Sequence, residues 1–190
     1  MFERVFRMGA TLPNLVSLGR LCASPITVWL VLIGEFQWAF WLFVLSGLSD
    51  AADGILARLL KARSVLGTYL DPIADKAMLV GAFFALGYAG VMPVWIVVLV
   101  VSRDLFIIGG AVLVHTLAAG DGPIRPSVIS KINTFLQIVL AGIGLAVGAF
   151  ALEAYGLVTP LAWMVAVTSV ASGLGYLIEA GRRIGLEEVS

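Results

Sequence analysis

Apolar positions along the chain fall into long runs, and short polar or turn-forming segments separate them. Each run is close to the length of about 20 residues that an α-helix needs to cross the hydrocarbon of a bilayer. The pattern predicts six spans, at 14–34, 37–60, 66–89, 92–117, 127–151 and 157–180. We therefore expect an all-α fold, an integral membrane bundle of six transmembrane helices, in a single domain over residues 1–190.

Composition supports a membrane protein. Of the 190 residues 61% are hydrophobic and 13% are charged, whereas soluble domains carry about 25% charged residues. A water-soluble fold of this length would leave much of its apolar surface exposed. The formal net charge is zero and no basic tract occurs, so we expect no nucleic-acid partner.

The basic residues predict the orientation of the spans. Lysine and arginine gather at alternate ends of successive spans: Arg4, Arg7, Arg58, Lys61, Arg63, Arg125, Lys131, Arg182 and Arg183. By the positive-inside rule, both termini and the second and fourth connections are cytoplasmic. No transit peptide is recognisable and the chain is compact, so we expect a multi-pass protein of the bacterial inner (plasma) membrane, with a processed mitochondrial protein as the alternative.

Four aspartates interrupt the second and third spans. Asp50 and Asp53 are three residues apart on one predicted helix, and Asp71 and Asp75 are four apart on the next. Each pair therefore projects from one helix face. The two helices run antiparallel about the connection near 61–64, which brings all four carboxylates to a similar depth. Because a charged side chain in hydrocarbon costs several kcal/mol, such residues mark a functional site.

Four converging carboxylates call for cations. In a low dielectric they repel one another, so one or more must take up a proton or bind a counter-ion. Two divalent cations remove the repulsion, and oxygen-only ligands suit Mg2+, Mn2+ or Ca2+. No histidine or cysteine lies nearby to indicate zinc.

Small residues share the helix stripes of the aspartates. Gly54, Ala57 and Gly67 remove side-chain bulk there, which opens a slot beside the carboxylates. The alternative is that they only let two helices pack closely, as small residues do in membranes. Arg58 is placed to meet a phosphate at the cytoplasmic mouth of the slot.

The spacing over 50–75 resembles the signature of the CDP-alcohol phosphatidyltransferase family, D-x2-D-G-x2-A-R-x8-G-x3-D-x3-D, at every fixed position. The resemblance implies a six-helix homodimer that transfers a phosphatidyl group from CDP-diacylglycerol to an alcohol and releases CMP. It also implies a metal-containing site open to the cytoplasm and laterally to membrane lipids. The residues that carry the match are Asp50, Asp53, Gly54, Ala57, Arg58, Gly67, Asp71 and Asp75.

The resemblance assigns roles to these residues. It implies that Asp50, Asp53 and Asp71 hold two divalent cations, Mg2+ or Mn2+, and that Asp75 lies near them as the general base. Contact with the CDP-lipid is implied for a larger set: Asn14, Arg20, Gly54, Ala57, Arg58, Ser64 and Gly67.

Two basic residues are candidates for the acceptor alcohol. Arg103 interrupts the fourth span beside Asp104, and either forms a local ion pair or faces an anionic acceptor. Lys131 begins the fifth span, and either binds an acceptor phosphate or sets the topology. We expect both to bind the acceptor.

The segments around Arg103 and Lys131 also bear on which alcohol is used. Ser102-Arg103-Asp104 and residues 126–134 are similar to the pattern of the mitochondrial-type cardiolipin synthases, whose acceptor is phosphatidylglycerol. Phosphatidylglycerophosphate synthases, which use glycerol 3-phosphate, typically have Arg-Glu and Gly-Lys where this chain has Asp104 and Ser130. We expect cardiolipin synthesis from phosphatidylglycerol, with glycerol 3-phosphate as the alternative acceptor.

A cation-coupled transporter is the alternative from a different class, because intramembrane carboxylates are typical of transporters as well. The sequence shows no inverted repeat, and all four acids lie beside one cytoplasmic connection. Both features favour the enzyme.

Overall fold

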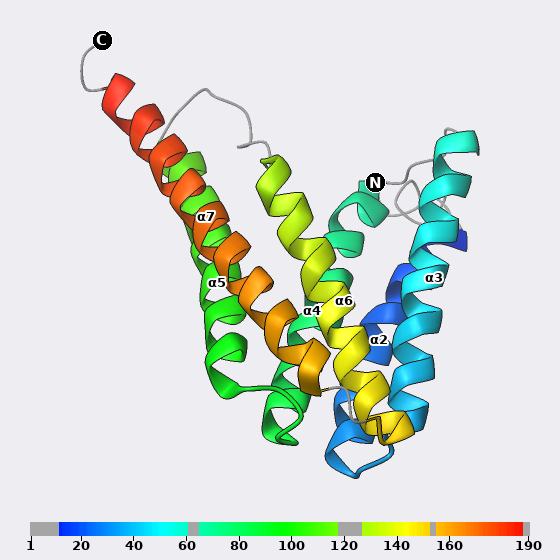
Figure 1. Ribbon diagram of the computed structural model, residues 1–190. Helices are drawn as coiled ribbons and strands as arrows, with labels where there is room; N and C mark the ends of the chain where they lie inside the picture. The colour runs from blue at the N-terminus through cyan, green and yellow to red at the C-terminus, as the bar shows by residue number, and fades with distance from the viewer. Residues whose placement is uncertain (1–11, 61–64, 118–126, 153–154, 188–190) are drawn as a thin grey trace. The chain divides into compact units, whose positions relative to one another are not determined.

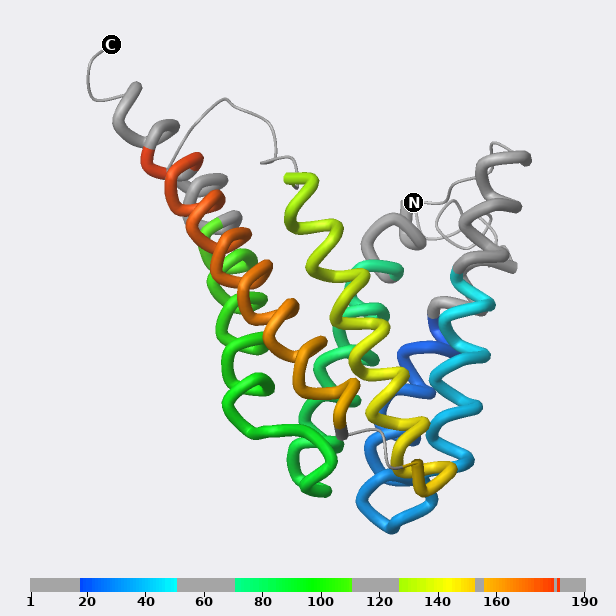
Figure 2. Tube along the Cα trace, viewed as in Figure 1, coloured from blue at the N-terminus to red at the C-terminus, as the bar shows by residue number. Residues whose placement is uncertain are grey.

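The computed structural model describes residues 12–60, 65–117, 127–152 and 155–187, and it describes side chains within 18–50, 71–110, 127–152 and 156–179 (Figures 1 and 2). The described chain contains helices and no strand, which confirms the all-α prediction. The helices are α2 (Leu12–Leu32), α3 (Phe36–Leu60), α4 (Val65–Tyr88), α5 (Val94–Leu117), α6 (Val128–Phe150) and α7 (Tyr155–Glu187).

Each predicted span corresponds to one helix, with ends that differ by a few residues except at the C-terminus of α7. Two stretches of the described chain, Val128–Phe150 and Gly156–Glu179, are long and apolar enough to cross a membrane. A bundle of six membrane spans stays a prediction.

Large apolar side chains lie exposed on every described helix. Trp38 on α3 is 68% exposed and Phe106 on α5 is 72% exposed, and Trp29, Tyr88, Phe135 and Trp163 represent the other four helices. Exposed apolar surface on this scale is typical of a face that contacts a partner protein or a membrane.

The chain forms two compact units. The first comprises Met1–Met92 and Ala141–Glu153, with α2, α3, α4 and the second half of α6. The second comprises Pro93–Leu140 and Ala154–Ser190, with α5, the first half of α6 and α7.

In the first unit, α2 packs against both α3 and α4. A Cβ atom added at Gly81 of α4 would lie 2.9 Å from Cγ2 of Val28 and 3.3 Å from Oγ of Ser24, both on α2. The absence of a side chain at Gly81 therefore allows the two helices to approach closely. Phe83 and Leu86 of α4 are fully buried and belong to the core.

Three helices end in tight left-handed turns. Gly34 after α2 and Gly90 after α4 have φ angles of 84° and 72°, and Ala151 after α6 has a φ of 49°. In each turn a backbone N–H reaches back five residues to a carbonyl: Glu35 to Leu30 at 2.8 Å, Val91 to Leu86 at 3.0 Å and Leu152 to Val147 at 3.3 Å. This hydrogen bond belongs to the Schellman motif, which satisfies carbonyls at a helix end.

In the second unit, α5 and α7 pack along one another. The rings of Trp95 and Trp163 lie 5.0 Å apart between centroids, and Ile96, Val100 and Val165 are fully buried. The buried face of α6 in this unit carries polar residues as well, and these form one of the two polar clusters described next.

Candidate active site

Three helices of the first unit bring one arginine to three aspartates. Arg20 lies on α2, Asp50 on α3, and Asp71 and Asp75 on α4. Asp71 and Asp75 share a face of α4 because they are four residues apart. Since α2 packs on both other helices, its polar residue meets the carboxylates of each.

The Arg20 guanidinium contacts all three carboxylates. Its Nη1 lies 2.7 Å from Oδ1 of Asp50 and also donates a hydrogen bond to Oδ1 of Asp75. Its Nη2 lies 3.5 Å from Oδ1 of Asp71. Nε of Arg20 has no hydrogen-bond partner in the described part of the chain. One guanidinium thus serves as counter-ion to carboxylates from two helices.

Exposure distinguishes the arginine from the aspartates. The Arg20 side chain is 6% exposed, whereas those of Asp50, Asp71 and Asp75 are 43%, 45% and 51% exposed. The cation is therefore buried and the carboxylates remain accessible. Three negative charges against one positive charge leave this group of four side chains at −2, which a divalent cation would balance.

The carboxylates around Arg20 offer the type of donor atom that a hard metal ion needs. Carboxylate oxygens are the ligands that hard divalent cations prefer, so donor type and charge fit Mg2+ or Mn2+. Within the described ranges, no three or more side chains of His, Cys, Asp or Glu already form a metal-binding group. The side chain of Asp53, the fourth predicted ligand, lies outside those ranges.

Other predicted site residues also lie outside the described residues. Ser64 is one of them. The side chains of a further set fall outside the description although their backbone is helical: Asn14, Gly54, Ala57, Arg58 and Gly67. The pairing of Arg20 with the aspartates was missed by the sequence analysis, which associated Arg20 with the CDP-lipid alone. The available signal was an arginine inside an apolar span, since such a residue needs an acidic partner.

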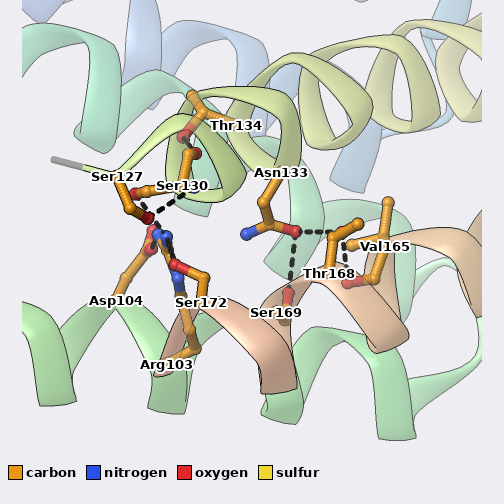
Figure 3. A network of polar contacts seen from close by, with 10 residues as sticks. All are labelled: Arg103, Asp104, Ser127, Ser130, Asn133, Thr134, Val165, Thr168, Ser169 and Ser172. Carbon is orange, nitrogen blue, oxygen red and sulfur yellow. Dashed lines mark hydrogen bonds and ion pairs between the residues drawn. The ribbon is translucent and has the colours of Figure 1, made fainter. Parts of the chain in front are cut away.

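A second polar cluster lies in the second unit and is centred on Arg103 of α5 (Figure 3). Arg103 and Asp104 are buried, at 7% and 4% exposure. Nη1 of Arg103 donates to Oδ1 of Asp104 at 2.8 Å. Nη2 donates to Oγ of Ser130 on α6 at 2.7 Å and to Oγ of Ser172 on α7 at 2.6 Å. The guanidinium therefore joins three helices.

The start of α6 is fixed beside this cluster. Ser127 precedes the helix, and its Oγ accepts a hydrogen bond from the Ser130 N–H at 3.2 Å. This is an N-cap interaction. Lys131 follows Ser130 in the first turn of α6 and is exposed, whereas Ser130 is buried. The Lys131 side chain is therefore accessible, while the Ser130 hydroxyl is bonded to Arg103.

Polar residues continue along α6 beyond Ser130. Oδ1 of Asn133 accepts hydrogen bonds from Oγ1 of Thr168 at 2.8 Å and from Oγ of Ser169 at 3.0 Å (Figure 3). Gln137, one turn further, is fully buried. The sequence analysis missed Ser172, Asn133 and Gln137 as parts of a network; their polar character within apolar helices was the signal.

The chain is similar to a known protein family and to several curated proteins. The family model described as CDP-alcohol phosphatidyltransferase matches residues 10–172. The chain is 36% identical over 185 residues to CDP-diacylglycerol-glycerol-3-phosphate 3-phosphatidyltransferase 1, chloroplastic, of Oryza sativa subsp. japonica, which covers 88% of this chain and 56% of that protein.

Relatives named cardiolipin synthase (CMP-forming) have a similar sequence identity to this chain. Cardiolipin synthase (CMP-forming) of Rattus norvegicus is 35% identical over 155 residues, 74% of this chain and 51% of that protein. The corresponding protein of Homo sapiens is 33% identical over 182 residues, 87% of this chain and 60% of that protein. The chain thus spans between about half and three fifths of the length of these curated relatives.

Proposed function

The chain belongs to the CDP-alcohol phosphatidyltransferase family, and we propose that it transfers a phosphatidyl group from CDP-diacylglycerol to phosphatidylglycerol, releasing CMP and forming cardiolipin. The observation that carries the catalytic part is the group of half-exposed carboxylates of Asp50, Asp71 and Asp75 around the buried Arg20. The family match over residues 10–172 covers helices of both units, which supports one catalytic domain.

The donor half of the reaction is assigned to the first unit. Asp50, Asp53, Asp71 and Asp75 would hold two divalent cations, Mg2+ or Mn2+, which supply charge neutralisation at the pyrophosphate of the CDP-lipid. Arg20 orients the oxygens of Asp50, Asp71 and Asp75 before substrate arrives. Contacts to the CDP-lipid are proposed for Arg20 and for residues whose side chains the structure does not describe: Asn14, Gly54, Ala57, Arg58, Ser64 and Gly67.

The transfer step needs a base for the acceptor hydroxyl. Asp75 is half exposed, so it is accessible to an incoming alcohol. Its carboxylate takes the hydroxyl proton as the new oxygen–phosphorus bond forms and the bond from phosphorus to the CMP oxygen breaks. CMP leaves with the electron pair of that bond.

The acceptor is assigned to residues of the second unit. Lys131 is proposed to bind it directly, through the exposed ammonium group at the start of α6. Arg103 is proposed to act at the same acceptor site through its hydrogen bonds to Ser130 and Ser172. The similarity of 102–104 and 126–134 to the cardiolipin synthase pattern favours phosphatidylglycerol. Glycerol 3-phosphate is the second candidate, because relatives at 36% identity carry the name of the transferase for that acceptor.

The membrane setting is part of the proposal. We place six spans in the bacterial inner membrane, with both termini and the site on the cytoplasmic side, in a homodimer. The exposed apolar side chains on every described helix support a lipid environment, and two helices meet the requirements for a span.

CMP release by purified full-length protein in liposomes, with CDP-diacylglycerol and Mg2+, tests the proposal. Phosphatidylglycerol and glycerol 3-phosphate are compared as acceptors, with Asp75→Asn as the inactive variant and exposed Glu35→Gln as the matched control. Release with phosphatidylglycerol supports cardiolipin synthesis. Release with glycerol 3-phosphate alone moves the reaction to the other acceptor, and no Asp75-dependent release with either alcohol refutes the catalytic assignment.

A further inference from the structure

The hydrogen-bonding geometry of Arg103 restricts how it can meet an anion. A planar guanidinium offers two forks for bidentate binding of phosphate or carboxylate oxygens. One fork pairs Nε–H with a hydrogen of Nη2, and the other pairs a hydrogen of Nη1 with the second hydrogen of Nη2. Both forks therefore depend on Nη2.

In this protein Nη2 of Arg103 is used by two hydroxyls. Oγ of Ser130 lies 2.7 Å away and Oγ of Ser172 lies 2.6 Å away, from two different helices. Each oxygen accepts one of the two Nη2 hydrogens, so neither fork stays complete. Nε has no hydrogen-bond partner among the residues that the structure describes.

The charge of Arg103 is balanced as well. Nη1 donates to Asp104 at 2.8 Å, and both side chains are almost completely buried. A buried ion pair has little remaining attraction for a further anion, since its charge is already compensated at short range. Among the residues that the structure describes at the start of α6, the exposed ammonium of Lys131, next to Ser130 in sequence, then offers one positive charge.

One positive charge matches one type of acceptor better than the other. A phosphodiester carries one negative charge, whereas a phosphomonoester carries close to two at neutral pH. The second charge of a monoester needs another cation or a complete guanidinium fork. With Ser130 and Ser172 in place, Arg103 supplies neither.

We infer that the hydroxyls of Ser130 and Ser172 set the acceptor preference, because they occupy both Nη2 hydrogens of Arg103 and so favour a phosphodiester acceptor over a phosphomonoester. The inference rests on the proposed function. It makes Ser130 and Ser172 positioning residues that act through Arg103, and gives a physical reason for acceptance of phosphatidylglycerol over glycerol 3-phosphate.

Substitution of the two serines tests the inference. Ser130→Ala, Ser172→Ala and the double variant are compared with wild type for kcat/KM of CMP release with each acceptor, in liposomes with CDP-diacylglycerol and Mg2+. Hydrogen bonds to charged groups contribute about 1.5–3 kcal/mol, so the ratio of kcat/KM for glycerol 3-phosphate over that for phosphatidylglycerol rises at least about tenfold in the double variant.

Two controls separate selectivity from structural support. Ser130→Thr keeps the hydroxyl and retains the wild-type ratio. Ser169→Ala removes a hydroxyl that donates to Asn133 and not to Arg103, so it also leaves the ratio unchanged. Equal losses with both acceptors in the alanine variants, or a ratio within about twofold of wild type, overturn the inference.

A measurement on the wild-type protein tests the inference even if the serine variants do not fold. Inorganic phosphate is a dianion mimic at neutral pH, and we expect it not to compete with phosphatidylglycerol at millimolar concentration. Competition in the micromolar range shows an available guanidinium fork and overturns the inference. Wild type that releases no CMP with either acceptor refutes the proposed function itself, and the inference with it.

Discussion

Nη1 of Arg20 on α2 lies 2.7 Å from Oδ1 of Asp50 on α3, and the same nitrogen donates to Asp75 on α4. One buried nitrogen therefore connects α2, α3 and α4 of the first unit at the level of the carboxylates. This relationship makes Arg20 a structural counter-ion for the site, in addition to the CDP-lipid contact proposed for it.

Arg20→Ala is expected to destabilise the protein most in the absence of metal. Removal of one partner from a buried ion pair costs about 3–5 kcal/mol, and about 2 kcal/mol is expected here because the carboxylates are half exposed. Thermal unfolding in detergent with EDTA measures the loss, and added Mg2+ should restore more stability to the variant than to wild type. A loss below about 0.5 kcal/mol, with no extra response to Mg2+, contradicts the role of Arg20 as a counter-ion.

Asp71→Asn is expected to weaken divalent-cation binding. The change keeps the size of the side chain and removes one negative charge from a group at −2. Loss of an outer-shell partner already lowers metal affinity about 10–100-fold, so loss of a ligand lowers it at least about tenfold. Titration with Mn2+ followed by electron paramagnetic resonance, without substrate, measures the affinity. Wild-type affinity in Asp71→Asn, with Glu35→Gln as the control, excludes Asp71 as a ligand.

Asp75→Asn is expected to act mainly on turnover. Loss of a general base lowers the rate about 100- to 10,000-fold. With Mg2+ saturating, so that loss of one proposed metal ligand is offset, the KM for CDP-diacylglycerol should change much less than kcat, since the base acts on the acceptor hydroxyl. Steady-state CMP release under saturating Mg2+ measures both constants. If Asp75→Asn keeps more than about a tenth of the wild-type kcat, a group other than Asp75 acts as the general base.

Gly148→Ala is expected to destabilise the first unit. A Cβ atom at this position would lie 2.3 Å from a ring carbon of Phe36, whereas one at Gly142 on the same helix would lie 3.9 Å from Phe43. Overpacking costs about 1–3 kcal/mol, and Gly142→Ala as the matched control is neutral or slightly stabilising. Denaturation experiments on Gly148→Ala and Gly142→Ala measure the stability of each variant. Equal stabilities of the two would contradict the packing of Phe36 against Gly148 of α6.

Asn133→Ala is expected to destabilise the second unit. The change leaves the buried Ser169 hydroxyl without its acceptor, and an unsatisfied buried donor costs about 1–3 kcal/mol. The Thr168 hydroxyl can still donate to the carbonyl of Met164 at 2.8 Å. Thr134→Ala is the control, because in the described part of the chain that hydroxyl donates to the carbonyl of Ser130 in its own helix, at 3.1 Å. Loss of stability in the control and not in Asn133→Ala would contradict the network.

The sequence predicted the helices well because apolar run length is a strong and local signal. It was less informative where a helix continues beyond the apolar run: the sixth span was expected to end near residue 180, and α7 continues to Glu187. Hydropathy reports where hydrocarbon ends, whereas a helix ends where a breaker or a cap occurs.

The carboxylates could be anticipated from their spacing, because three- and four-residue intervals fix a helix face. Their contact with Arg20 could not. It depends on which face of α2 meets α3 and α4, and this rotation is set by packing around positions such as Gly81 and Val28. The same holds for Ser172, whose contact with Arg103 joins segments far apart in sequence.

The left-handed turns at Gly34, Gly90 and Ala151 bear on how the chain enters a membrane. Under the proposed topology these three turns are the parts that must be translocated, and Glu35 is the one charged residue in the first of them. In each turn a backbone N–H bonds to a carbonyl in the last turn of the preceding helix. Fewer backbone groups without a hydrogen bond therefore have to pass through hydrocarbon. Under this topology, the turns that must cross the membrane during insertion are therefore the ones whose transfer costs the least free energy. The polar second and fourth connections remain on the cytoplasmic side, where the chain is synthesised.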